Sequence, residues 1–219
     1  MSLIFDDEFS GASLPSTWEN CYWYSLNGCG NGNEMEWYTP NNISVSGGAL
    51  HLTAEKQTVN GHDYTSGMVT SYDHFSFTYG YVEWQAQIPA GQGFWPALWL
   101  LPENGSWPPE IDALEVVGAQ PDVATGTYHE PDGTSQGHDV VIPGLSSGGW
   151  HTFGVDWEPG SITWYIDGKA RYSSTTDVTS LPMYLVMNLA VGGTWPGPPN
   201  ASTPFPSSFN IDYVRVWQH

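Results

Sequence analysis

The sequence predicts an all-β fold in which two sheets pack on each other. Apolar residues nowhere recur over a long window at the i, i+3, i+4, i+7 spacing of an amphipathic helix. A Gly or Pro interrupts the chain roughly every 10–15 residues, with short runs of alternating apolar and polar residues between. Roughly a dozen strands without a covering helix must bury their apolar faces against one another, which favours a sandwich.

The alternating runs predict the strands in order. Residues 43–46 and 49–54 flank Gly47-Gly48 and predict a hairpin. Tight turns are indicated by Glu-Pro-Gly at 158–160 and by Asp167-Gly168. Further strands are predicted at 67–71, 79–88, 95–101, 150–157, 161–166, 169–172, 183–189 and 209–217. No repeat or linker divides the chain, so we expect residues 1–219 to form a single domain with a substantial core.

The strand at 95–101 has two different faces. Alternation places Trp95, Ala97 and Trp99 on one face and Leu98 and Leu100 on the other. The leucine face suits a core, whereas two indoles around a small alanine suit the floor of a groove. Because this strand closely precedes an acidic stretch at 110–115, we expect the two segments to be antiparallel neighbours.

Three carboxylates fall within residues 110–115, whose sequence is Glu-Ile-Asp-Ala-Leu-Glu. In a regular strand Glu110 and Asp112 would share a face with Leu114, while Glu115 would point among apolar residues. A β-bulge between Asp112 and Glu115 removes this conflict, because the extra residue returns Glu115 to the acidic face. We therefore expect a bulge, with Leu114 turned to the core. The alternative is an edge strand with a solvated acidic face.

The bulged arrangement suits acetal hydrolysis, which needs an acid for the leaving oxygen and a carboxylate for the anomeric carbon. Glu110 and Glu115 would be roughly 13 Å apart at Cα, at about 3.3 Å per strand step. Side chains leaning together can bring the carboxyls near the ~5–5.5 Å of a retaining glycosidase. Asp112 between them can raise the proton affinity of a neighbour. Metal binding is the weaker alternative, because one strand supplies every ligand and no histidine stands at metal-ligand spacing.

The composition limits the partners. The chain has 4 Lys+Arg against 23 Asp+Glu, a formal charge of −19. Four basic side chains are too few to neutralise a phosphate backbone, to hold an anionic membrane surface or to bind a sulfated polymer. We therefore expect neither a nucleic-acid nor a membrane partner. The 12 Trp and 12 Tyr are mostly expected in the core, but they also suit a neutral polysaccharide, whose C–H faces pack on aromatic rings. We expect a monomer.

Two cysteines bear on the compartment. A disulfide between Cys21 and Cys29 is plausible in a secreted protein, and two free thiols are the alternative. Few lysines and an acidic composition also fit an extracellular protein. The sequence contains neither a secretory leader nor an 18-residue apolar run. We expect secretion, with the leader absent from this sequence.

The acidic stretch and five further motifs resemble glycoside hydrolase family 16. Residues 110–115 are similar to its E-x-D-x-x-E signature, in the bulged form of bacterial endo-β-1,3-glucanases, or laminarinases. The other motifs that resemble the family are FDDEFSG at 5–11, NEMEWYTP at 33–40, GFWPALWLL at 93–101, MNLAVGGTWPG at 187–197 and IDYVRVW at 211–217. The resemblance covers nearly the whole chain.

This resemblance implies a β-jelly-roll sandwich with an open cleft on its concave sheet, and glycoside hydrolysis with retention and without a catalytic cofactor. It implies Glu110 as nucleophile, Glu115 as general acid/base and Asp112 as the assisting carboxylate. The implied sugar contacts are Trp95, Trp99, Trp195, Asn33 and His129; for His129 a structural, hydrogen-bonded role is the alternative. Many members carry a structural Ca²⁺, and the matching ligand positions are Glu8, the Gly48 carbonyl and Asp212. For Glu8 and Asp212 the alternative is that they cap strand ends.

The sequence also departs from the family pattern. Met68 and Tyr81 stand where many laminarinases have arginine near the cleft. An arginine-poor site argues against the anionic substrates of the carrageenan and porphyran branches. The expected substrate is therefore β-1,3 or mixed β-1,3/1,4 glucan, cut by an endo-acting enzyme. The alternatives are a glucan transglycosylase and a non-catalytic glucan-binding lectin.

Overall fold

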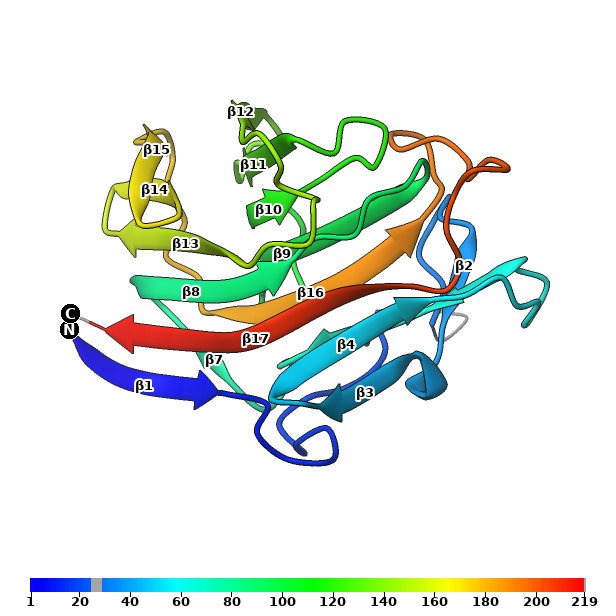
Figure 1. Cartoon of the computed structure of the whole chain (residues 1–219). Helices are drawn as coiled ribbons and strands as arrows, with labels where there is room; N and C mark the ends of the chain where they lie inside the picture. The colour runs from blue at the N-terminus through cyan, green and yellow to red at the C-terminus, as the bar shows by residue number, and fades with distance from the viewer. Residues whose placement is uncertain (25–28, 219) are drawn as a thin grey trace.

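The computed structural model describes residues 1–24 and 29–218, which form two antiparallel sheets packed face to face (Figure 1). This confirms the predicted all-β sandwich, and its arrangement is a β-jelly roll. The helix assigned within the described part is the 3-10 turn η1 (Pro40–Asn42). No helix among these residues is long and apolar enough to cross a membrane.

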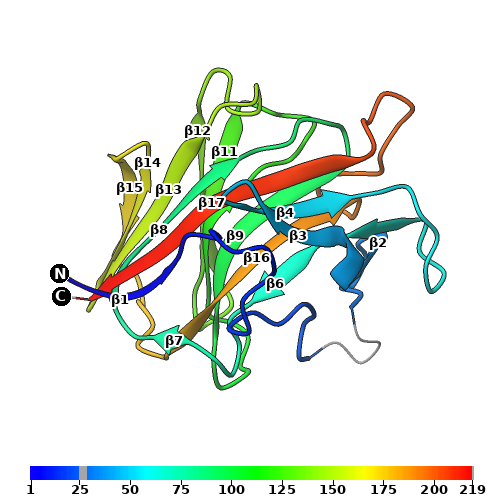
Figure 2. The same cartoon turned by 60° about the horizontal axis from the view of Figure 1, so that its bottom comes forward.

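The first sheet has eight strands in the order β15-β14-β13-β8-β17-β4-β3, with β1 pairing along β17. Its strands are β1 (Ser2–Asp7), β3 (Ile43–Ser46), β4 (Ala49–Ala54), β8 (Gly80–Gln87), β13 (His151–Glu158), β14 (Ser161–Ile166), β15 (Lys169–Ser174) and β17 (Ser207–Gln218). The N- and C-terminal strands are therefore neighbours, with Ser2 opposite Gln218. Figure 2 shows β1 beside β17 and the two chain ends together.

The second sheet has seven strands in the order β12-β11-β10-β9-β16-β6, with β7 pairing to β16. Its strands are β6 (Met68–Thr70), β7 (Ser76–Phe77), β9 (Phe94–Pro102), β10 (Glu110–Glu115), β11 (Val123–His129), β12 (Ser135–Val141) and β16 (Met183–Val191). The strands β2 (Glu36–Tyr38) and β5 (Tyr64–Ser66) form a small parallel pair beside it. The acidic stretch is β10, and its neighbour β9 is antiparallel to it as predicted.

The core lies between the two sheets and is filled by the side chains that the alternation assigned to it. Leu98 and Leu100 of β9 and Ile111 and Leu114 of β10 have no exposed surface. Trp84, Trp157 and Trp164 of the eight-stranded sheet are among the largest fully or almost fully buried side chains. Most of the strand predictions are confirmed because they rested on this contrast between buried and exposed faces.

Three strands of the seven-stranded sheet were missing from the sequence prediction, namely the two-residue β7 and the longer β11 and β12. In β11, Gly126 interrupts the alternation of apolar and polar residues. Glycine is required there because a Cβ would collide with the Tyr172 hydroxyl and the Trp164 indole. Strand β12 is an edge strand whose side chains are mostly exposed and polar, so it carries no apolar row. Both longer strands are specified by long-range pairing rather than by local pattern.

The predicted bulge is present in β10. Against β11, Asp112 pairs with Thr127 and Glu115 pairs with Thr125, so one strand advances three residues while the other advances two. The shift turns Glu115 to the face that carries Glu110 and Asp112. The Trp164 indole of the opposite sheet donates a hydrogen bond of 2.8 Å from Nε1 to the Asp112 carbonyl oxygen, at the start of the bulge. A buried bond across the sandwich thus anchors the irregular segment.

The segment before β2 is held against the cleft-bearing sheet. Cys21 and Cys29 form a disulfide, and the intervening residues 25–28 lie outside the described part. The Tyr38 amide of β2 donates to the Cys29 carbonyl, and Glu19 forms an isolated bridge with Thr70 of β6. These contacts fix both ends of the segment and bring its aromatic side chains to one side of the sheet.

The residues expected to ligate calcium are brought near one another by the backbone. Strands β1 and β4 pair in succession with one edge of β17, which places the end of β1 and the β3–β4 turn on either side of Asp212. The Glu8 carboxylate, however, accepts both Nε–H and a terminal N–H of Arg215, at 2.7 and 2.9 Å. Arg215 thereby lowers the pKa of Glu8. A guanidinium on both oxygens does not fit a calcium ligand, so this arrangement departs from the expected site.

Replacing Trp164 with Phe tests the anchoring of the bulge. The variant keeps most of the buried ring but leaves the Asp112 carbonyl without its indole donor, so we expect a loss of about 1–3 kcal/mol in the free energy of unfolding. Denaturant unfolding measures this, and amide hydrogen exchange over 111–116 should become faster. Trp157→Phe is the matched control, because Trp157 donates to the Thr179 carbonyl away from the bulge. Equal exchange at 111–116 in both variants would contradict the anchoring role.

Candidate active site

The three carboxylates of β10 face a cleft on the outer side of the seven-stranded sheet. The cleft encloses about 550 Å³. It is lined by Tyr22, Trp23, Tyr24, Asn31, Glu34, Trp95, Ala97, Trp99, Leu101, Pro102, Gly105, Ser106, Trp107, Glu110, Asp112, Glu115, Tyr184 and Asn188. Seven of these are Trp or Tyr, so the carboxylates sit in an apolar, ring-lined surrounding, as the face of β9 predicted.

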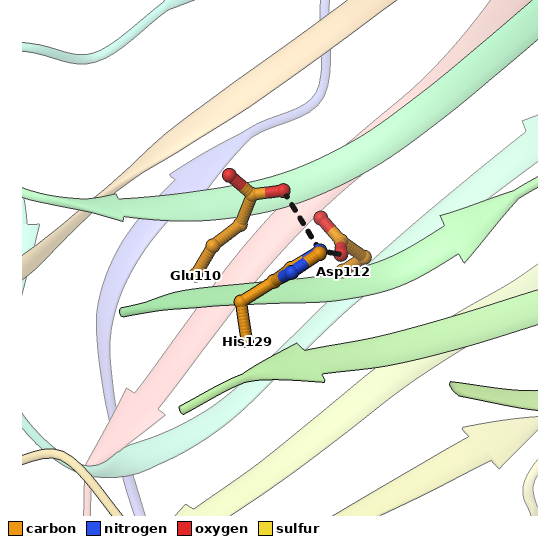
Figure 3. A group of neighbouring side chains, drawn as sticks. All are labelled: Glu110, Asp112 and His129. Atoms are coloured by element: carbon orange, nitrogen blue, oxygen red, sulfur yellow. Dashed lines mark ion pairs between the residues drawn. The ribbon is translucent and has the colours of Figure 1, made fainter. Parts of the chain in front are cut away.

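Glu110 stands at the start of β10 and is held from two sides. The Trp107 indole donates from Nε1 to Glu110 Oε2 at 2.8 Å. His129 of β11 lies directly opposite Glu110 in the strand register. Its Nε2 is 3.5 Å from Glu110 Oε1 and 3.2 Å from Asp112 Oδ2 (Figure 3).

Glu115 stands at the other end of β10 and has its own donors. Trp95 Nε1 donates to Oε1 at 3.1 Å, and the Thr127 hydroxyl donates to Oε2 at 3.2 Å. Trp95 comes from β9 and Thr127 from β11, so the strands on both sides of β10 position this carboxylate. The two glutamates therefore have separate hydrogen-bond environments although they lie on one strand.

Burial sets the protonation of the trio. It raises the pKa of Glu110 well above its usual range, and the neighbouring Asp112 charge adds to the effect. Burial and the Glu115 charge likewise raise the pKa of Asp112. For Glu115, burial and then the Glu110 charge raise the pKa to about 7, against the donors Thr127 and Trp95. Three carboxylates packed together in an apolar cleft disfavour the fully ionised state, so the trio retains a proton to higher pH than separate carboxylates would.

Some of the predicted sugar contacts line the cleft and others lie outside it. Trp95 and Trp99 line the cleft. Trp195 packs edge-on against Trp95 with ring centroids 5.4 Å apart and is 48% exposed, so it extends the aromatic surface outward. Asn33 is exposed and does not line the cleft, whereas its neighbours Asn31 and Glu34 do.

A chain of hydrogen bonds connects the cleft floor to a second acidic pair. Trp99 Nε1 donates to Asn188 Oδ1 at 2.8 Å, Asn188 donates to the Tyr38 hydroxyl at 3.0 Å, and Tyr38 donates to Glu34 at 3.2 Å. Beside Glu34 lies the fully buried Glu36, which accepts the Val191 amide at 2.6 Å. Burial raises the pKa of both carboxyls.

Several site residues were not found from the sequence. Trp107 stands three residues before Glu110, but nothing local shows that its indole turns back to bind that carboxylate. Trp23 stacks on Tyr72 at 5.0 Å and donates to the Tyr184 hydroxyl, in a segment with no strand pattern. Thr127 belongs to β11, a strand that local alternation did not reveal.

Comparison with known proteins extends this picture. The family model described as glycosyl hydrolases family 16 matches residues 30–215. An endo-1,3-1,4-beta-glycanase, ExsH, of Rhizobium meliloti is 36% identical over 99% of this chain and 52% of its own length. A beta-glucanase of Rhodothermus marinus is 35% identical over 99% of this chain and 85% of its own. The chain thus spans about half the length of the Rhizobium relative.

A solved structure agrees with the sequence relatives. The laminarinase catalytic domain of Thermotoga maritima MSB8 superposes with a TM-score of 0.91 at 33% identity, covering 100% of this chain and 98% of the other. Fold, family match and full-length sequence similarity point the same way. The chain belongs to glycosyl hydrolase family 16.

Proposed function

We propose that this chain is an endo-acting β-glucanase that cuts β-1,3 or mixed β-1,3/1,4 glucan with retention of anomeric configuration. The observation that carries the proposal is the pair Glu110 and Glu115, on one face of a bulged strand in an aromatic cleft. Relatives named as beta-glucanases and a structural neighbour that is a laminarinase support the same substrate class.

The proposed reaction is a double displacement. The reactive state has Glu110 ionised and the proton on Glu115. The Glu110 carboxylate attacks the anomeric carbon while Glu115 gives its proton to the departing glycosidic oxygen, so the C–O bond breaks and a glycosyl–enzyme ester forms. Glu115, now ionised, takes a proton from water, which attacks the ester and releases the sugar and the Glu110 carboxylate. A pKa of about 7 suits Glu115 to both steps. The chemistry needs carboxyl groups and water alone, and no cofactor.

The cleft walls account for substrate binding in this proposal. Trp95, Trp99 and Trp195 offer ring faces and edges to the C–H surfaces of glucose units. Asn33 and His129 remain predicted sugar contacts. His129 lies against the Glu110 and Asp112 carboxylates, beside the place where the sugar would react. With only 4 Lys+Arg in the chain, sulfated sugars would find few cationic partners, which favours a neutral polymer.

We further propose that residues 1–219 act as one catalytic domain, as a monomer and outside the cell. The two sheets share one core, which supports a single unit. The Cys21–Cys29 disulfide supports an oxidising compartment.

Amide substitutions test the two catalytic roles. Glu110→Gln and Glu115→Gln should each lower kcat on laminarin or lichenan by about 10³-fold or more, because each step of the displacement loses its reacting group. Release of reducing sugar measures this. Glu103→Gln is the control, since Glu103 lies beyond the cleft and accepts the Asp73 amide. A Glu110→Gln variant as fast as the unmodified enzyme would refute the nucleophile assignment.

The same assay separates the alternatives. Binding of laminarin without cleavage of any polymer would favour a lectin. Products longer than the substrate would favour a transglycosylase.

The pH profile tests the proton on Glu115. Because the acid form is needed and its pKa is about 7, kcat/KM should fall as the pH rises through that value. Thr127→Val removes a donor that favours the ionised carboxylate, so the alkaline limb should move to higher pH by up to about one unit. Thr125→Val is the matched control, because the Thr125 hydroxyl donates to Asp139. An unmoved limb in Thr127→Val would contradict the assignment of the limb to Glu115.

The resemblance predicts calcium at Glu8, Gly48 and Asp212, whereas the Glu8–Arg215 pair argues against Glu8 as a ligand. Since Arg215 occupies both Glu8 oxygens, we expect Tm to be the same in excess CaCl₂ and in a calcium chelator. Scanning calorimetry measures this. A Tm that rises with calcium in the unmodified protein but not in Glu8→Gln would show that Glu8 leaves Arg215 to bind the ion.

A further inference from the structure

His129 and two of the cleft carboxylates form a compact set of metal-ligand atoms. One atom each of Glu110, Asp112 and His129 lies within 4.8 Å of the other two. In the described part of the chain this is the single group of three or more His, Cys, Asp or Glu side chains gathered so closely. Figure 3 shows the imidazole of β11 directed between the two carboxylates of β10.

The spacing fits a small divalent cation. Ligand atoms about 2.0–2.1 Å from a tetrahedral Zn²⁺ are about 3.3–3.4 Å from one another. His129 Nε2 is 3.2 Å from Asp112 Oδ2 and 3.5 Å from Glu110 Oε1. The Glu110 and Asp112 oxygens also lie within 4.8 Å of each other, so all three atoms can reach one cation.

The surrounding residues already orient the three ligands. The Ser135 hydroxyl is 2.8 Å from His129 Nδ1. In the tautomer that carries its proton on Nδ1, this N–H donates to Ser135 and Nε2 keeps its lone pair for a metal. Trp107 holds the other oxygen of Glu110. Asp112 is 2% exposed, and its buried Oδ2 lacks a hydrogen bond of standard geometry, with His129 Nε2 as its polar neighbour at 3.2 Å. With Nε2 unprotonated, that oxygen faces a lone pair instead of a donor, so a cation between the two atoms would satisfy both.

This donor set overturns the sequence argument against a metal. That argument held that one strand supplies every ligand and that no histidine is suitably spaced. In the structure His129 comes from the neighbouring strand and is the direct register partner of Glu110. Three protein ligands would leave a fourth coordination position, toward the cleft, for a water molecule. Three protein ligands and one water make up an open, four-coordinate zinc site.

We propose that Glu110, Asp112 and His129 form a reversible inhibitory site for Zn²⁺, or for a divalent cation that shares its preference for imidazole and carboxylate ligands. The inhibitory role rests on the proposed function. A cation bound to Glu110 occupies the lone pair that would attack the anomeric carbon, so metal and glucan exclude each other. The metal has no part in the hydrolysis itself.

Zinc binding can be measured without activity, by isothermal titration calorimetry at about pH 7.5, roughly a unit above the usual histidine pKa. We expect one site in the unmodified protein, weakened about tenfold or more in His129→Asn and in Asp112→Asn. The control His138→Asn removes an exposed imidazole of β12 that packs on Tyr172, and should leave the affinity unchanged. Circular dichroism shows that each variant is folded. Equal affinity in His129→Asn and the unmodified protein would overturn the proposal.

Competition with sugar tests the inhibitory role. Glu115→Gln keeps all three proposed ligands, so a laminari-oligosaccharide can be titrated against Zn²⁺ at equilibrium in that variant. Each ligand should weaken the apparent affinity of the other. Simultaneous, independent binding would overturn the inhibitory role. If Glu115→Gln still cleaves glucan, the proposed function fails, and the calorimetry of His129→Asn continues to decide the metal site by itself.

Discussion

The hydrogen bond from the Trp164 indole to the Asp112 carbonyl is the constraint on which the catalytic face depends. Side chains of a regular strand point alternately to its two faces, so residues three apart point to opposite faces. With a core on one face, Asp112 and Glu115 could not both reach the other face. The bulge relaxes this rule at one point, and a buried donor from the opposite sheet holds the relaxed segment. Leu114 stays in the core and Glu115 reaches the cleft because both conditions are met.

Burial then gives the carboxylates distinct properties. They lie among Trp and Tyr rings rather than cations, so desolvation dominates and every pKa in the trio rises. Donors differ between the two ends of β10: an indole on Glu110, and an indole with a hydroxyl on Glu115. The trio therefore retains a proton to higher pH than separate, solvent-exposed carboxylates would.

Local pattern predicted much of this fold and part of the site. The bulge followed from the conflict between Leu114 and Glu115, and the cleft floor from the two faces of 95–101. What depends on register could not be predicted, because the sequence does not say which residue of β11 meets Glu110. His129 was therefore expected as a sugar contact or a hydrogen-bonded structural histidine, without its two carboxylate partners being identified. Similarly, the sequence did not reveal that Glu8, an expected calcium ligand, pairs with Arg215, 207 residues away in the chain.

The pairing of β1 with β17 has a practical meaning for attachment. The first and last strands lie side by side in the eight-stranded sheet (Figure 1). The cleft lies on the seven-stranded sheet. A flexible tether fused to either end, or a solid support coupled through it, would start from the sheet that does not bear the cleft. Such an attachment would leave the face with the cleft uncovered, which makes the two ends equivalent positions for joining this unit to another.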